Sequence, residues 1–305
     1  MASKTFSEIG VLGLYTETPL HCGAEGGTGY VDLPIQRERH THYPVIPGST
    51  VKGVLRDELA GGLTGEQIDA VFGKEVADGK STIPGSVSFG DGVLVAFPIR
   101  SSGAPFHWVT CPFVLERVYR ALGVQQKVQS PGAGQAWAKE GGKDSHVLLE
   151  EIRLTRVADA AFFTDDAGSP VSRLLDLLPE EEKGFGYTRS IFRDRLLIVS
   201  DKDFKELVET GTDVVARIKL TALGTTTNIP DGEHTEIQGN DRKGNMFVEE
   251  LVPPEALFLA SLRGDGRWTD ALVQALKARP VIRLGGDETV GRGVTHMSYV
   301  PGKGV

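Results

Sequence analysis

The stretch DLPIQRERHTHYPVIPGSTVKGVLR, residues 32–56, holds the strongest structural signal in this 305-residue chain. Apolar side chains follow its Pro-Gly-Ser turn at a helical spacing, at Val51, Val54, Leu55 and Leu59. This spacing predicts an amphipathic helix over 49–59. Lys52 and Arg56 are four residues apart, so they lie one turn apart on another face of the helix. Because free N–H groups at a helix start bind anions, we expect a phosphate site here.

The segment before this helix is rich in cations, although the whole chain is acidic. Between Ile35 and Arg56 there are four Arg or Lys residues and one acid, Glu38. The formal net charge is −8 and the pI is about 5.5, whereas nucleic-acid-binding domains are usually basic. Acidic residues gather elsewhere, for example at 180–182 and 249–250. This distribution favours a polarised surface with one cationic face.

Five stretches together give a family resemblance. They are PIQRE at 34–38, PVIPGSTVKGVLR at 44–56, LYTETPLHCGAEGG at 14–27, FVEELVPPEALF at 247–258 and IRLGGDETVGRG at 282–293. In this combination the chain resembles the RAMP superfamily of CRISPR proteins, and within it the backbone subunits of the type III-B effector (Cmr) complex. The resemblance runs from residue 14 to residue 293 and therefore covers nearly the whole chain.

Strand and helix signals alternate along the chain, which indicates an α+β or an α/β fold. Strands are predicted at 9–15, 87–99, 148–157, 195–200, 214–220, 256–262 and 280–284. Helices are predicted at 49–59, 64–73 and 112–122, after a cap at Asp201, and at 270–278. The resemblance implies the α+β class, with one RAMP domain over 1–305 built as a ferredoxin-like (RNA-recognition-motif-like) palm with insertions. It also implies a β-hairpin thumb at about 221–247.

Asp32 is the first catalytic candidate. From its neighbours alone, it is either a loop acid in a turn before Pro34 or a functional carboxylate. The resemblance implies that the aspartate in this VDLPIQRE context acts in cleavage of target RNA. The RNA would supply the 2′-hydroxyl as nucleophile, and a carboxylate can position it, accept its proton or hold a divalent ion. Because one carboxylate cannot build a two-metal site, we expect a weakly bound Mg²⁺ or another divalent cation at Asp32.

Three further residues are weaker catalytic candidates. His21 lies near Asp32 in the sequence, and it is either a structural histidine or a general acid for the leaving 5′-oxygen. Glu249 and Glu250 follow the expected thumb. Paired acids on a strand are usually solvated, and the alternative is a proton or metal role near the cut.

The RNA-binding candidates lie in two places. Around the helix they are Arg37, Arg39, Ser49, Thr50, Lys52 and Arg56, and in a late glycine-rich loop they are Gly285, Gly286, Thr289, Gly291, Arg292 and Gly293. The alternative for the helix cations is that they form a solvated face. The alternative for the loop is a tight connection between two strands. GSTVKG does not fit the phosphate-loop pattern GxxxxGK followed by Ser or Thr, which disfavours a nucleotide hydrolase. The resemblance implies contacts to the guide-RNA backbone that do not read its sequence.

Cysteine usage and hydropathy indicate the compartment. Cys22 and Cys111 are far apart and lack metal-ligand spacing, which disfavours a disulfide framework. No basic-then-apolar leader opens the chain, and no apolar run approaches the length of a membrane span. These features predict a cytoplasmic protein with no membrane partner.

The residues and the resemblance together predict a repeated backbone subunit of a type III-B CRISPR complex. Its copies would form a head-to-tail filament along one guide RNA (crRNA) and cut complementary target RNA at regular intervals by 2′-hydroxyl attack. The implied partners are guide RNA, target RNA, further copies of the chain, a large polymerase-like subunit, small subunits and capping RAMP subunits. Two alternatives remain open: a non-catalytic guide-RNA-binding scaffold, and a guide-processing RAMP endoribonuclease that works without metal.

Overall fold

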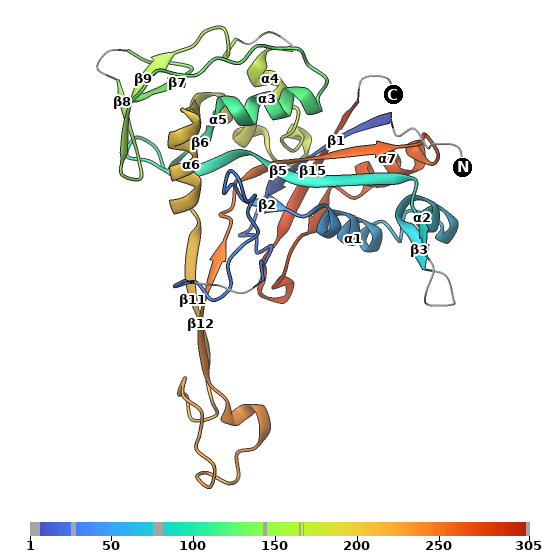
Figure 1. The fold of residues 1–305 in the computed structure, drawn as a ribbon, viewed down its shortest axis with the longest axis vertical. Helices are drawn as coiled ribbons and strands as arrows, with labels where there is room; N and C mark the ends of the chain where they lie inside the picture. The colour runs from blue at the N-terminus through green and yellow to red at the C-terminus, as the bar shows by residue number, and fades with distance from the viewer. Residues whose placement is uncertain are drawn as a thin grey trace.

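The computed structural model describes residues 7–25, 29–75, 82–142, 145–164, 166 and 168–302. Its main sheet has eleven strands, in the order β14-β15-β1-β13-β5-β6-β10-β7-β9-β8, with β2 paired to β5. Helices flank this sheet, and one long hairpin projects away from the body (Figure 1). The chain is therefore a mixed α+β fold on one large mixed sheet.

The elements have the following bounds. The main sheet holds β1 Ser7–Thr16, β2 Val45–Ile46, β5 Val87–Arg100, β6 Phe106–Thr110, β7 Gln135–Ala138, β8 His146–Leu149, β9 Ile152–Ala158, β10 Leu196–Ile198, β13 Leu257–Gly264, β14 Val281–Arg283 and β15 Val294–Pro301. Two hairpins lie outside it: β3 Gly73–Glu75 with β4 Thr82–Pro84, and β11 Asp213–Lys219 with β12 Asn245–Leu251. The helices are α1 Gly48–Glu58, α2 Gly65–Phe72, α3 Pro112–Ala121, α4 Pro170–Leu175, α5 Gly186–Arg195, α6 Asp201–Thr210 and α7 Thr269–Ala278.

Strand β1 is buried along most of its length. Its side chains Ile9, Val11, Leu12, Leu14 and Tyr15 each retain at most 2% of their surface. Both faces of the strand are covered, which explains why its sequence is a nearly continuous apolar run. Helix α1 packs against β5 and α7 packs against β15. The chain after α4 crosses β1 so closely that a Cβ atom at Gly13 would lie 2.0 Å from the Leu177 carbonyl oxygen.

Two helices form as their sequence signals predict. In α1, Val51 and Leu55 are fully buried, which confirms the apolar face predicted from the helical spacing. In α2, Thr64 Oγ1 accepts the Gln67 N–H at 3.3 Å, and Gln67 Oε1 accepts the Thr64 N–H at 2.8 Å. This reciprocal capping box satisfies two N–H groups that the helix itself cannot pair.

Three local predictions were wrong. Residues 148–157 are not one strand, because the backbone turns at Glu150 (φ +48°) and separates β8 from β9. The cap of α6 is Ser200 and not Asp201, since Ser200 Oγ accepts the Asp203 N–H at 3.1 Å. The segment 280–284 is not the last strand: β15 follows it and pairs with β1.

The projecting hairpin consists of β11 and β12, which pair antiparallel along their full lengths (Figure 1). The predicted thumb range, about 221–247, covers mainly its tip, because β11 ends at Lys219 and β12 begins at Asn245. The tip is polar and is organised by one guanidinium. Arg242 donates to the carbonyl oxygens of Ile229, Pro230, Glu233, His234 and Ile237.

The two cysteines, Cys22 and Cys111, are both free and buried, in agreement with the prediction that no disulfide joins them. Within the described ranges, no helix is long and apolar enough to cross a membrane.

We expect Gly13→Ala to destabilise the protein, because the new methyl group would overlap the Leu177 backbone. Overpacking of this kind costs about 3 kcal/mol of unfolding free energy. The matched control is Gly53→Ala on α1, where nothing lies within 4 Å of the added Cβ. Removing a helical glycine there raises stability by about 1 kcal/mol. Denaturant unfolding of both variants tests the contrast, and equal effects would contradict it.

Candidate functional site

The catalytic candidates meet along the edge of β12 that faces away from β11. Residues 20–25 and 29–37, which we call the strap, run along this edge. Two isolated bridges join the strap to this part of the chain, Leu33 to Glu249 in β12 and Leu20 to Val252 directly after it. The edge of an otherwise unprotected hairpin strand is thereby paired, and the strap side chains are fixed relative to it.

Asp32 is exposed at this edge and is held by Val248. The Asp32 N–H donates to the Val248 carbonyl oxygen at 3.0 Å, and Asp32 Oδ2 accepts the Val248 N–H at 2.8 Å. Oδ1 has no hydrogen-bond partner among the residues that the structure describes. An exposed carboxylate with a fixed orientation and one free oxygen can accept a proton or ligate a cation.

His21 lies further along the same edge and is 9% exposed. Its Nδ1 is 2.9 Å from the carbonyl oxygen of Glu250. A carbonyl oxygen only accepts, so Nδ1 carries the hydrogen and Nε2 is the nitrogen left for proton exchange. A Cβ atom at Gly23 would lie 2.8 Å from Nε2, so a glycine there keeps the space beside this nitrogen open. This geometry suits the general-acid role predicted for His21.

Glu249 is completely buried, and the expectation that paired acids on this strand are solvated is therefore wrong. Both Glu249 carboxylate oxygens lie 3.4 Å from Arg217 Nη1, and the same nitrogen lies 2.7 Å from Asp287 Oδ2. His21 Nδ1 is 3.8 Å from Glu249 Oε1. Burial, and then the neighbouring Asp287, raise the pKa of Glu249. The hydrogen bond from Arg217 lowers the pKa of Asp287.

Glu250 and Arg37 form an ion pair with each other. Arg37 Nη2 donates to Glu250 Oε1 at 2.6 Å, and Thr212 Oγ1 donates to the same oxygen at 2.9 Å. The Ile35 N–H donates to Glu250 Oε2 at 3.1 Å. Arg37 Nη1 also donates to two backbone carbonyls. The geometry therefore favours a structural role for this pair over the catalytic and RNA-binding roles predicted for it.

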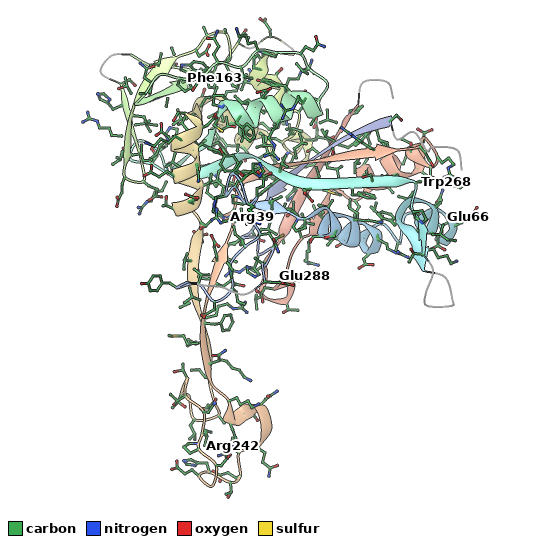
Figure 2. All side chains as sticks on the ribbon, in the orientation of Figure 1. Arg39, Glu66, Phe163, Arg242, Trp268 and Glu288 are labelled. Atoms are coloured by element: carbon green, nitrogen blue, oxygen red, sulfur yellow. The ribbon has the colours of Figure 1, made fainter. Side chains whose placement is uncertain are left out.

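The cations of α1 and its approach remain available at the surface. Arg39 is exposed on the side of the molecule where the hairpin begins (Figure 2). Lys52 is half-buried and has no ion-pair partner within the described part of the chain, and Arg56 Nη2 is 3.9 Å from Asp69.

The predicted anion site at the start of α1 is partly filled by the protein itself. The Gly48 N–H donates to Asp91 Oδ1 at 2.7 Å, so this donor is not free for a phosphate. Ser49 is exposed and Thr50 is half-buried in the first turn, where no acidic residue occurs. A phosphate would therefore contact the hydroxyl groups of Ser49 and Thr50 and the Lys52 ammonium group, and not the Gly48 N–H.

The glycine-rich loop packs against the strap. The Gly286 N–H donates to the His21 carbonyl oxygen at 2.9 Å, and the Gly293 N–H donates to that of Pro19 at 2.9 Å. Gly285 and Gly293 have φ values of +80° and +77°. The other predicted residues of this loop differ in exposure: Thr289 and Gly291 are exposed, and Arg292 is half-buried. Only part of the loop thus faces outward, and the rest fixes the strap backbone.

A preformed metal centre is not found in the described ranges, where no group of three His, Cys, Asp or Glu side chains could hold an ion. The Glu249 oxygens face Arg217, so they are poor ligands for a cation. Asp32 offers one free carboxylate oxygen. Mg²⁺ commonly keeps several waters and binds through one or two carboxylates plus phosphate oxygens, so Asp32 fits such an ion only when RNA completes its coordination.

Two residues of this site, Arg217 and Asp287, were not predicted from the sequence. Asp287 lies in the glycine-rich stretch 282–293, directly after Gly286, and Arg217 lies next to apolar residues on a predicted strand. A charged residue among apolar ones on a strand is a sign that the strand has a polar partner. The identity of that partner depends on contacts 70 residues away in the sequence.

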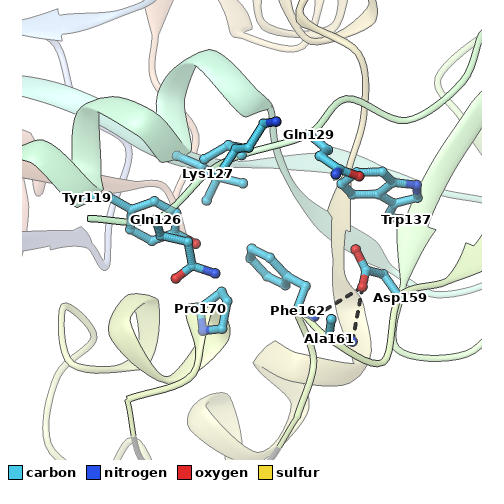
Figure 3. Close-up of a pocket in the computed structure, with 11 residues that line it drawn as sticks. Tyr119, Gln126, Lys127, Gln129, Trp137, Asp159, Ala161, Phe162 and Pro170 are labelled. Atoms are coloured by element: carbon cyan, nitrogen blue, oxygen red, sulfur yellow. Dashed lines mark hydrogen bonds between the residues drawn. The ribbon is translucent and has the colours of Figure 1, made fainter. Parts of the chain in front are cut away.

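A separate cavity of about 250 Å³ lies between α3 and α4, far from these residues in the chain (Figure 3). Phe162 lies between Tyr119 and Gln126 on one side and Trp137 on the other (Figure 3). Asp159 Oδ1 accepts two backbone N–H groups at its border. None of the predicted site residues lines this cavity.

Comparison with known proteins identifies relatives along almost the whole chain. The RAMP superfamily pattern matches residues 14–296. The chain is 32% identical over 298 residues to the CRISPR system Cmr endoribonuclease Cmr4 of Pyrococcus furiosus, with 93% of this chain and 92% of that protein covered. The crystal structure of oligomeric Cmr4 from Pyrococcus furiosus matches 96% of this chain and 98% of its own, with a TM-score of 0.64 and 27% identity.

A subunit of the type III-B Cmr-beta complex bound to cognate target RNA has the same fold. Its TM-score is 0.68, and the match covers 96% of this chain and 98% of that subunit at 20% identity. At this identity the comparison concerns the fold alone.

We expect Arg37→Met to lower stability, because it leaves the buried Glu250 carboxylate without its cation. Breaking a buried ion pair from one side costs about 3 kcal/mol. The matched control is Arg39→Met, two residues away and exposed, which should leave the unfolding midpoint unchanged. Thermal melts of the two variants provide the measurement. If Arg37→Met melted like the wild type but bound RNA more weakly, the structural assignment of Arg37 would be wrong.

Proposed function

The chain belongs to the RAMP superfamily and is Cmr4-like over nearly its full length, and we propose that it is the repeated backbone subunit of a type III-B CRISPR complex. In this proposal it binds guide RNA and cuts complementary target RNA at regular intervals. The observation that carries the cleavage function is Asp32, an exposed carboxylate held in one orientation by Val248 at the base of the hairpin. The relative named Cmr endoribonuclease supports the same activity.

We also propose that the core is ferredoxin-like and that the hairpin is the thumb. Along the chain the core elements run β1-α1-β5-β13-α7-β15, which is the βαββαβ order of that fold. Their positions in the sheet are β15-β1-β13-β5, all antiparallel to their neighbours. The remaining strands and helices are insertions into this core.

Asp32 and His21 have complementary roles in the proposed cleavage. Asp32 Oδ1 would orient the 2′-hydroxyl of the RNA and accept its proton as the oxygen attacks the neighbouring phosphorus. His21 Nε2 would give a proton to the leaving 5′-oxygen, while Nδ1 keeps its hydrogen on the Glu250 carbonyl. The products are a 2′,3′-cyclic phosphate and a 5′-hydroxyl. Asp32 and His21 lie along the same edge of β12, so one RNA strand laid on this edge can reach both.

As the alternative to this proton transfer, Asp32 Oδ1 would instead hold a divalent cation, Mg²⁺ in the simplest case, weakly and with RNA oxygens as its other ligands. When bound, it would neutralise charge on the scissile phosphate. Within the described residues no group of three His, Cys, Asp or Glu side chains could hold an ion, so in this proposal RNA oxygens supply most of the ligands.

Guide RNA would lie along α1 and the outward part of the glycine-rich loop. Arg39, Ser49, Lys52 and Arg56 would contact phosphates, and the glycines would allow close approach of the backbone. Further copies would add head to tail along the guide, as the oligomeric relative suggests. The large polymerase-like subunit, the small subunits and the capping RAMP subunits would complete the complex.

We expect Asp32→Ala to abolish the regular cuts in a complementary RNA, with a loss of about 10²- to 10⁴-fold in rate. RNA affinity should stay within about twofold of the wild type, because Asp32 carries no positive charge. The measurement is single-turnover cleavage of end-labelled RNA by the assembled complex, in Mg²⁺ and in chelator.

Each alternative function predicts a different result in that experiment. Binding without cuts in either protein leaves a non-catalytic scaffold. Cutting of a precursor guide that persists in chelator and in Asp32→Ala indicates a guide-processing enzyme.

We expect Lys52→Ala to weaken guide binding to a similar degree for guides of different sequence, because a lysine–phosphate contact carries no base information. Removing one such contact should reduce the slope of log Kd against log salt by about 0.7 for single-stranded RNA. Titrations of two unrelated guides at several salt concentrations test this. A change in affinity for one guide alone would contradict a backbone contact.

A further inference from the structure

A charged pair joins the base of the hairpin to the glycine-rich loop beside His21. Arg217 Nη1 on β11 lies 2.7 Å from Asp287 Oδ2 in the loop. The same nitrogen lies 3.4 Å from both oxygens of Glu249 on β12. The Arg217 guanidinium also sits 5.3 Å from the centre of the Phe247 ring, so its position is fixed from a second side.

Asp287 connects this pair to the backbone of His21. The residue before it, Gly286, donates its N–H to the His21 carbonyl oxygen at 2.9 Å. Gly285 approaches so closely that a Cβ atom there would lie 2.3 Å from that same oxygen. A loop anchored through Asp287 therefore sets where the His21 main chain lies.

Glu249 connects the pair to the His21 ring. Its carboxyl group lies 3.8 Å from His21 Nδ1. It is fully buried, with both of its oxygens facing Arg217 Nη1. A buried carboxyl group keeps its place only when its partners are fixed. Arg217 and Asp287 thus hold both neighbours of His21, the loop on the carbonyl side and Glu249 on the imidazole side.

We infer that Arg217 and Asp287 are positioning residues for RNA cleavage, which act by aiming His21 Nε2 at the leaving 5′-oxygen. This inference rests on the proposed function. In the step concerned, the bond between the 2′-oxygen and phosphorus forms and the bond between phosphorus and the 5′-oxygen breaks. The 2′-hydroxyl proton passes to Asp32, and the Nε2 proton of His21 passes to the 5′-oxygen. Neither Arg217 nor Asp287 touches the reacting atoms.

The test compares Asp287→Asn with wild type in the assembled complex, by single-turnover cleavage and by RNA affinity. We expect the cleavage rate to fall about 10-fold, since small errors in the position of a catalytic group are costly, and the Kd to change less than about twofold. Arg217→Lys keeps the charge but loses the planar guanidinium that lies over Phe247, so it should cleave more slowly than the wild type and faster than Arg217→Gln. The matched control is Glu288→Gln, the exposed neighbour of Asp287, which should cleave like the wild type (Figure 2).

A double-variant comparison shows whether the effect passes through His21. In a His21→Ala background, adding Asp287→Asn should cause no further loss, because the group it positions is gone. An undiminished rate for Asp287→Asn, or an equal further loss in the His21→Ala background, would overturn the inference. If Asp287→Asn melts well below the wild type, Arg217→Lys decides: wild-type cleavage by that folded variant would also overturn it.

Failure of the proposed function gives a different result. In that case the wild type makes no regular cuts, or Asp32→Ala cuts as fast as the wild type. An effect of Asp32→Ala without any effect of Asp287→Asn leaves the proposed function standing and removes only the positioning role.

Discussion

The site depends on the buried carboxylate of Glu250. This group accepts hydrogen bonds from the strap, through Arg37 and the Ile35 N–H, and from the chain just before β11, through Thr212. A buried charge is tolerated only when it is paired and hydrogen-bonded, so these three partners are fixed together. The strap consequently lies in one register along β12. The contacts to Glu250 therefore fix the positions of Asp32 and His21 along the edge of β12.

The two adjacent acids of β12 serve different purposes because successive side chains of a strand point to opposite faces. Glu250 points to the strap and is satisfied by Arg37. Glu249 points to the other face, where Arg217 and Asp287 meet it. A sequence of two glutamates thus connects the strap on one side and the glycine-rich loop on the other. The catalytic edge lies between two charged anchors, each made by a carboxylate and an arginine.

A feature of the fold or site could be predicted from the sequence when the residues that interact lie close together along the chain. Helix α1 and the capping box at Thr64 depend on neighbours within four residues, and both were predictable. Asp32 was identified from its resemblance and its local context. The burial of Glu249 could not be read, because its partner Asp287 lies 38 residues further along the chain. Arg37 was predicted to bind RNA as one of several nearby cations, but only the fold reveals its ion pair with Glu250.

The hairpin is ordered by different means at its two ends, which explains how a two-stranded element can project so far. An isolated hairpin is marginally stable in water. One face of this one carries Val214, Ile218 and Met246, all largely exposed, so packing of that face contributes little. At the base, Glu250 ties β12 to the body through Arg37, and Arg217 of β11 pairs with both Glu249 of β12 and Asp287 of the glycine-rich loop. At the tip, Arg242 satisfies the carbonyl groups of the connecting loop. The register of the strands is therefore set at both ends by arginines, and the base, where register fixes the catalytic edge, has the stronger, buried anchor.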